Sequence, residues 1–310
     1  MMRALPRLAL LASLLVAANG PALAREDSLN ERVFDRAWEL VADRYWDPKM
    51  GGNDWGLIRD RFYPQAIAAR GEKQLYAVIN RMLDQLDDSH VYATSPSELA
   101  RSKEPPEEGD EPSARRMTRL DGGLLLLAFD QFDPGDDRWV RQAIAETPGL
   151  RGVILDLRNN SGGRDDVLDR IAGTFTRERR VLVRLSGKRD IEEKTRGSGA
   201  GAYLGPLAVI VGPDTASAAE ILAYFLDENG AFTVGQRSAG AVTGGVDHGL
   251  PGGGRITIAE YDVRTAGGKR LEGDGFTPRY RVSAAKKPND LALARAVALL
   301  KGAGPREARP

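Results

Sequence analysis

The sequence predicts an α/β protein in which a layered sheet-and-helix core follows a small N-terminal helical bundle. The chain has 310 residues, of which 42% are hydrophobic and 28% charged, values typical of a globular protein with one large or two modest domains. Apolar residues recur every three or four positions over residues 29–87, as in amphipathic helices. After residue 118, short apolar runs bounded by Gly and Pro alternate with helical stretches, as in an α/β sheet.

The first 24 residues are typical of a secretory signal peptide. Two Arg precede an apolar run over residues 8–18, and Ala22-Leu23-Ala24 stands before a charged stretch. The apolar run is about half of the roughly 20 residues that a helix needs to cross a bilayer. We therefore expect cleavage near Ala24, a mature form without a membrane span and a periplasmic location.

Residues 25–95 are predicted to form a bundle of three helices that ends in Asp87-Asp88-Ser89-His90. Its aromatic side chains have the spacing of a helical core rather than of a ligand platform. They are Trp38, Tyr45, Trp46, Trp55, Phe62 and Tyr63. Residues 96–117 are rich in Pro and acids and have no apolar periodicity, so they are predicted to be a linker.

Residues 118–285 are predicted to form the α/β core, followed by a C-terminal helix and tail over residues 286–310. Expected strands cover 124–129, 152–157, 181–185, 207–211, 232–234 and 256–263. Expected helices cover 138–146, 165–175, 216–229 and 290–300. Strands and helices that alternate over short connections indicate a sheet covered by helices.

Composition excludes several functions. Lys plus Arg number 44 and Asp plus Glu also 44, so no net field favours nucleic acid, and we expect no nucleic-acid partner. The absence of Cys excludes disulfides, thiolate metal sites and Cys nucleophiles. His90 and His248 are the two His of the chain, so any imidazole chemistry must use one of them.

Two segments are predicted to pass from strand through a tight turn into a helix. The first is the strand at 152–157 followed by Arg158-Asn-Asn-Ser-Gly-Gly163, whose glycines and free N–H groups suit an anion. It lacks the Gly-Lys-Ser/Thr and G-x-G-x-x-G patterns of nucleotide sites, which leaves a developing oxyanion as the other candidate. The second places Ser217 where the strand at 207–211 turns into a helix, a nucleophile position. On the residues alone, the simpler interpretation is that Asp214, Thr215 or Ser217 serves only as the helix N-cap.

An activated Ser needs a base, and the scarcity of His favours His90 for that role. His248 lies in the Gly-rich stretch 244–249, which is predicted to be a surface turn that orients an imidazole poorly, although it could contact substrate. Asp165, Asp166 and Asp169 form an acidic cluster, which the dipole at a helix start explains more simply than a metal does. No metal or cofactor is predicted.

Four motifs in order resemble the C-terminal processing peptidases and the catalytic core of tricorn protease, serine peptidases with a crotonase-like (ClpP/crotonase-type) α/β core. They lie at 153–163, 215–220, 234–240 and 272–278, downstream of Asp88-Ser-His90. The resemblance implies Ser217 as nucleophile and His90 as base. It further implies that Ser89 and Glu272 orient the imidazole, and that the backbone N–H of Ala218 and of Gly162 or Gly163 forms the oxyanion hole.

The chain departs from the tail-specific branch in two ways. Ala241 stands where that branch has its general-base Lys, so the pattern is that of the Ser-His type. About 30 residues separate His90 from Leu124, too few for the PDZ domain of that branch. We expect a serine peptidase acting on a peptide or unfolded protein; the alternatives are a ligand- or lipid-binding protein on the same scaffold, as in interphotoreceptor retinoid-binding protein, and an esterase or amidase.

Overall fold

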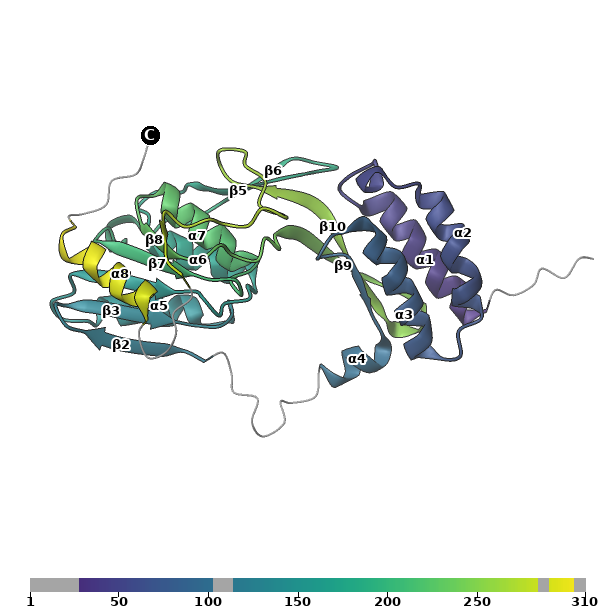
Figure 1. Ribbon diagram of the computed structural model, residues 1–310, viewed down its shortest axis with the longest axis horizontal. Coiled ribbons are helices and arrows are strands. Elements are labelled where there is room, and N and C mark those ends of the chain that lie inside the picture. The colour runs from purple at the N-terminus through teal and green to yellow at the C-terminus, as the bar shows by residue number, and fades with distance from the viewer. Residues whose placement is uncertain (1–27, 103–113, 284–289, 304–310) are drawn as a thin grey trace, which may run out of the picture.

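The computed structural model describes residues 28–102, 114–283 and 290–303, which form a helical end and a sheet-containing end joined by a long β-ribbon (Figure 1). The α-helices are α1 (Leu29–Arg44), α2 (Trp55–Ile67), α3 (Glu72–Leu83), α4 (Pro96–Arg101), α5 (Asp136–Ala145), α6 (Asp165–Thr174), α7 (Ala218–Glu228) and α8 (Leu291–Lys301). The strands are β1 (Tyr92–Thr94), β2 (Arg116–Leu120), β3 (Leu124–Ala128), β4 (Gly152–Asp156), β5 (Val181–Gly187), β6 (Ile191–Lys194), β7 (Leu207–Val211), β8 (Phe232–Gly235), β9 (Thr243–Gly249), β10 (Arg255–Arg264) and β11 (Tyr280–Arg281).

Helices α1, α2 and α3 form the expected bundle. A capping box starts α1, in which the Ser28 hydroxyl accepts from the Glu31 N–H and the Glu31 carboxylate accepts from the Ser28 N–H. The prediction that the aromatic residues form a core is confirmed. Tyr45, Trp55 and Phe62 are buried in the bundle's hydrophobic cluster, and Trp38, Trp46 and Tyr63 pack against it.

The main sheet has the strand order β11-β8-β7-β4-β3-β2 within the described residues, and all neighbours are parallel except β2 and β3. Both faces are buried, which explains why its central strands are continuous apolar runs. Along β4, Val153 and Leu155 face the cluster that includes α5, α6 and α7, while Ile154 faces α8. The parallel strands therefore all end at one edge, where the two predicted turns lie.

A second sheet is built around β10, which pairs with β1, β5 and β9. In its first half, Ile256 and Ile258 are buried in the bundle's cluster; in its second half, Val263 is buried in the main cluster. Figure 1 shows the β9–β10 ribbon running from the helical bundle to the main sheet. One strand thus belongs to both hydrophobic cores and fixes their relative position.

The structure differs from the sequence-based expectations at several places. Residues 96–101 lie in the expected linker but form α4, whose capping box joins Ser95 and Glu98. The stretch 244–249, expected as a surface turn, belongs to strand β9, which pairs with β10 along its length. The signal peptide predicted at 1–24 and residues 103–113 of the expected linker lie outside the described residues. Within the described ranges, no helix combines the length and apolar character that a bilayer crossing requires.

A charged contact ties α8 to the end of β4. The Arg158 guanidinium donates to both carboxylate oxygens of Asp156, at 2.9 and 2.6 Å, and of Asp290, the N-cap of α8, at 3.0 and 2.7 Å. Asp156 is 6% exposed, and Arg158 is its close, bidentate partner, while Arg116 lies farther from it at 3.6 Å.

We expect Arg158→Ala to lower the free energy of unfolding by about 1–3 kcal/mol, because it leaves the buried Asp156 carboxylate without its bidentate partner; the partial exposure of Arg158 keeps the loss below that of a fully buried pair. The measurement is urea denaturation. Arg184→Ala is the control, since Arg184 pairs with Glu192 at the surface, and its loss should cost less than about 1 kcal/mol. Equal losses in the two variants would contradict this reading of the contact.

Candidate active site

Ser217 lies at the turn between β7 and α7, in a backbone conformation that an ordinary N-cap does not need. Its φ of 52° and ψ of −122° lie outside the extended region usual for N-caps. Such strain costs on the order of 1–3 kcal/mol and persists where the surroundings impose it. Ser217 is the N-cap residue of α7 by position, and its strained backbone forms a sharp strand-to-helix elbow, a conformation in which nucleophilic Ser residues are found.

A fully buried carboxylate, Glu220, holds this elbow in place. It accepts hydrogen bonds from the N–H groups of Ser217 at 3.2 Å, Gly240 at 2.9 Å and Ala241 at 3.0 Å, and from the Ser238 hydroxyl. The Ser217 N–H also donates to the Ala241 carbonyl at 3.0 Å. Glu220 therefore joins the elbow to the loop between β8 and β9. Sequence reasoning did not single it out, although a lone acid in the apolar start of α7 was a signal.

The glycine turn after β4 lies against the elbow. A Cβ added to Gly162, whose φ is +104°, would come within 2.7 Å of the Ser217 Cβ and 3.2 Å of the Ala218 nitrogen, so only Gly fits. Buried Asn160 links the two turns, since its carbonyl accepts from the Ala216 N–H and its side chain accepts from the Gly162 N–H.

Gly162 and Gly163, the two glycines expected as alternative oxyanion donors, differ in the hydrogen bonding of their N–H groups. The Gly162 N–H is bound to Asn160 at 2.9 Å. Among the described residues, the N–H groups of Gly163 and Ala218 have no hydrogen-bond acceptor. A developing oxyanion needs free backbone donors, so the hydrogen bonding favours Gly163 over Gly162 as a candidate donor.

The structure brings three of the predicted site residues together across the two ends of the molecule. The Ser89 hydroxyl donates to the Glu272 carboxylate at 3.1 Å and lies 2.9 Å from His90 Nδ1. Asp88 accepts from the His90 N–H at 3.0 Å and from the Tyr45 hydroxyl at 3.1 Å, which anchors this turn to the bundle. The other Glu272 oxygen accepts from the Val242 N–H.

These contacts assign the tautomer of His90. A hydroxyl has one proton, and that of Ser89 is donated to Glu272, so Ser89 must accept from His90 Nδ1–H. In the neutral imidazole this places the proton on Nδ1, so that Nε2 is the nitrogen able to act as a base. Burial raises the pKa of the Glu272 carboxyl above its ordinary value; the Val242 N–H counteracts this, and the nearby Asp88 charge adds to it.

No hydrogen bond in the described part of the chain joins His90 to Ser217. Their connection runs through the loop between β8 and β9, where Ala241 bonds the Ser217 N–H and the adjacent Val242 bonds Glu272. Gly245 of β9 passes beside the imidazole, since a Cβ there would lie 3.8 Å from the His90 Cβ.

His248 is not part of this arrangement. It lies on strand β9 rather than in a surface turn, and its Nε2 contacts Glu260 at 2.7 Å. The prediction of a turn was wrong because the strand's glycines pack closely: a Cβ on Gly244 would lie 2.8 Å from the Tyr261 Cβ.

The acidic residues at the start of α6 are engaged with Arg side chains. Asp166 pairs with Arg164 and Arg170, and Asp169 pairs with Arg196. Burial raises the pKa of Asp165. Over residues 28–102, 114–283 and 290–303, no three His or acidic side chains are grouped as metal ligands.

Comparison with protein families decides the relationship. The model of peptidase family S41 matches residues 123–282, which is more than half of the chain and includes Ser217 and Glu272. The chain belongs to peptidase family S41. The tricorn protease C1 domain matches residues 30–84, the bundle that precedes Ser89 and His90. The resemblance inferred from the motifs is thereby confirmed.

Two curated relatives are similar to this chain over only part of their own length. The chloroplastic carboxyl-terminal-processing peptidase 2 of Arabidopsis thaliana is 38% identical over 112 residues, 35% of this chain and 21% of the relative. A probable CtpA-like serine protease of Staphylococcus epidermidis is 27% identical over 170 residues, 53% of this chain and 35% of the relative. The chain thus spans about a fifth to a third of the length of these relatives.

A solved structure shows the same fold over most of the chain. The photosystem II D1 C-terminal processing protease superposes with a TM-score of 0.66 at 20% identity, covering 87% of this chain and 97% of that one. Since identity is low, this similarity supports the α/β fold with a helical N-terminal region.

The role of Glu220 can be tested through stability. We expect Glu220→Ala to lower the free energy of unfolding by about 3 kcal/mol or more, because the N–H groups of Gly240 and Ala241 lose their acceptor. The Ser217 N–H and the Ser238 hydroxyl each lose one of two acceptors and keep a backbone carbonyl. Glu228→Ala, at the other end of α7, is the matched control and should change stability by less than about 1 kcal/mol. Chemical denaturation followed by circular dichroism measures both. A loss no greater than that of the control would show that Glu220 does not hold the elbow.

Proposed function

We propose that this chain is an exported serine peptidase, built on a crotonase-like core over residues 118–285, that hydrolyses peptide bonds through an acyl-enzyme on Ser217. The bundle over residues 25–95 supplies the general base, His90. The observation that carries the proposal is the hydrogen-bonded series Glu272–Ser89–His90, which assigns the proton of the neutral imidazole to Nδ1 and leaves Nε2 as the basic nitrogen. A third group that fixes the tautomer and stabilises the imidazolium is the arrangement on which Ser-His catalysts depend.

The reaction follows from these positions. His90 Nε2 takes the proton of the Ser217 hydroxyl as its oxygen attacks the scissile carbonyl, and the oxyanion that forms accepts from the N–H groups of Ala218 and Gly163. The imidazolium then gives its proton to the leaving amine, and an ester on Ser217 remains. Water attacks that ester with His90 again as base, and the acid product leaves with the hydroxyl restored.

The direct contact between His90 and Ser217 that this mechanism needs forms with substrate bound. Catalytic hydrogen bonds are often long in ligand-free enzymes and shorten in the complex. The negative charge of Glu272 reaches the imidazolium through Ser89, so all three residues act on one proton transfer.

The nucleophile and base are tested by labelling the purified protein with a fluorophosphonate and measuring intact mass. We expect wild type to be labelled once, Ser217→Ala not at all and His90→Ala at a rate lower by about 10²- to 10⁴-fold, the usual contribution of a general base. His248→Ala is the matched control and should be labelled at the wild-type rate. A folded wild type that resists labelling would support the binding-protein alternative; labelling without cleavage of peptides would support an esterase or amidase.

Because Glu272 titrates, we expect its contribution to kcat/KM to depend on pH. Glu272→Gln should lower kcat/KM by about 10²- to 10⁴-fold at pH values where the wild-type carboxylate is ionised. Because burial raises this pKa, the wild type binds the proton at a higher pH than an exposed Glu does, and the ratio of wild type to variant should shrink as pH falls through that value.

The measurement is kcat/KM against pH for wild type, Glu272→Gln and the control Glu260→Gln. The control removes a partly buried carboxylate that contacts His248 rather than Ser89, so its ratio to wild type should not follow the same curve. A ratio for Glu272→Gln that stays constant from neutral to acidic pH would refute a role for the Glu272 charge.

A further inference from the structure

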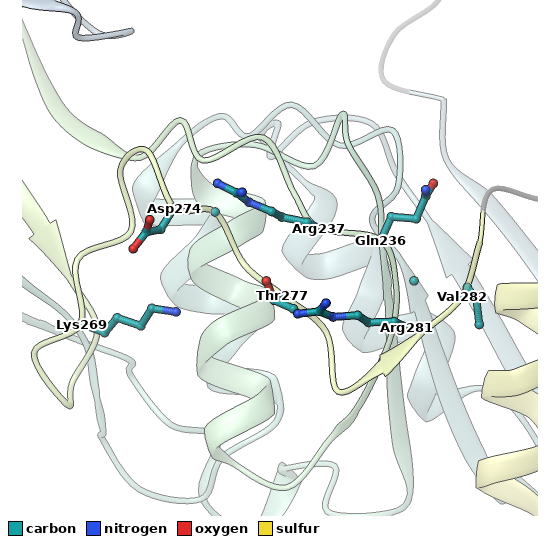
Figure 2. Close-up of a pocket in the computed structure, with 9 residues that line it drawn as sticks. Gln236, Arg237, Lys269, Asp274, Thr277, Arg281 and Val282 are labelled. Carbon is teal, nitrogen blue, oxygen red and sulfur yellow. The ribbon is translucent and has the colours of Figure 1, made fainter.

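A basic cleft lies at the carboxyl ends of β8 and β11, beside the loop that carries Glu272. It has a volume of about 560 Å³. Figure 2 shows Arg237, Lys269 and Arg281 extending into it from three separate segments, with Thr277 on its floor. Its one lining acid is Asp274, so three cations face a single carboxylate.

The described part of the chain does not neutralise the cations of this cleft. Within the described residues, none of the three forms a salt bridge. Arg237 donates to the Gly273 carbonyl at 2.8 Å, and the Lys269 ammonium lies 5.1 Å from the centre of the Tyr224 ring. Both contacts orient a side chain without cancelling its charge. Positive groups gathered in a concave surface concentrate an anionic ligand.

The cleft lies on the same edge of the sheet as Ser217. Strand β8 is the neighbour of β7, and β11 is the neighbour of β8, all running parallel. Neighbouring strands are about 4.8 Å apart, so the ends of β8 and β11 are roughly 5 and 10 Å from the end of β7. Ligands of such sheets bind at this edge. An extended peptide advances about 3.3 Å per residue, so a chain held at Ser217 reaches the cleft within a few residues.

The cleft also shares its wall with the site. Gln236 and Arg237 begin the loop that reaches Ser217 at Ala241, and Asp274 and Gly275 follow Glu272 directly. Close packing joins the two segments, since a Cβ on Gly275 would lie 2.7 Å from the Ser238 carbonyl oxygen.

We propose that this cleft is a specificity subsite that binds a carboxylate of the substrate, within a few residues of the cleaved bond. Its role toward substrate rests on the proposed peptidase function; its affinity for a carboxylate does not. Lys269 and Arg281 supply charge-assisted hydrogen bonds, and the Thr277 hydroxyl adds a neutral donor. The carboxylate belongs either to a Glu or Asp side chain or to the C-terminus of the peptide.

The test measures peptide binding to the Ser217→Ala variant by fluorescence anisotropy, so it does not depend on turnover. Labelled peptides are compared in pairs that differ by Glu against Gln at one position, scanned along the peptide, and by a free against an amidated C-terminus. We expect the carboxylate member of one pair to bind about tenfold more tightly, and salt to reduce the difference. The pair that shows it identifies the source of the carboxylate.

Variants in the cleft decide the assignment. Lys269→Gln with Arg281→Gln should abolish the preference, and Lys269→Arg should retain it. Lys194→Gln with Arg184→Gln is the charge-matched control, because these residues flank Glu192 at the surface, and it should leave the preference unchanged.

Equal binding within every pair, or a preference that survives in the cleft variant, would overturn the proposal. A carboxylate preference in a protein whose wild type cleaves no peptide would refute the proposed function and leave the subsite standing. Efficient peptide cleavage by a protein that shows no carboxylate preference would refute the subsite and leave the proposed peptidase function standing.

Discussion

The relative position of the two ends of this molecule depends on β10, because that strand is buried in two hydrophobic cores at once. Ile256 and Ile258 belong to the core of the bundle and Val263 to the core of the main sheet. A bulge separates the two halves between Ala259 and Tyr261, and there the Trp46 N–H donates to the Ala259 carbonyl at 3.0 Å. Since protein interiors pack densely, a strand that is buried in both cores leaves them little freedom to move relative to one another. His90 and Ser217 come from opposite ends of the molecule, so their alignment is a property of this packing.

Polar contacts then hold the strained elbow in that frame. The conformation of Ser217 is unfavourable by itself, and the buried Glu220 offsets its cost through four accepted hydrogen bonds. The same carboxylate also fixes Gly240 and Ala241, the residues next to the one that bonds Glu272. Ser217 and Glu272 are therefore held by neighbouring positions of one loop, and a displacement of either is resisted by both.

Much of the fold could be predicted from local sequence. The runs at 152–157 and 207–211 are buried on both faces, so their apolar character was unambiguous, and the helical periodicity of 29–87 gave the bundle. Strand β9 could not be predicted, because its glycines are required by close packing against Tyr261 and Thr257, which lie elsewhere in the sequence. Likewise, the motifs named Ser217, His90, Ser89 and Glu272, but the choice of Gly163 over Gly162 depends on where the Asn160 side chain points, which no spacing reveals.

The loop at Ala241 bears on why the helical bundle must be held against the main sheet. Tail-specific enzymes, which this sequence resembles, carry their general-base Lys at this position, next to the nucleophile on the same core. Here the Ala241 N–H bonds Glu220 and the Val242 N–H bonds Glu272, so the segment links the Ser217 turn to the Glu272 carboxylate. A base supplied from this loop needs only the core. A base supplied by His90 needs the bundle to be held against the core, which makes the double burial of β10 a requirement of the proposed chemistry and not only of stability.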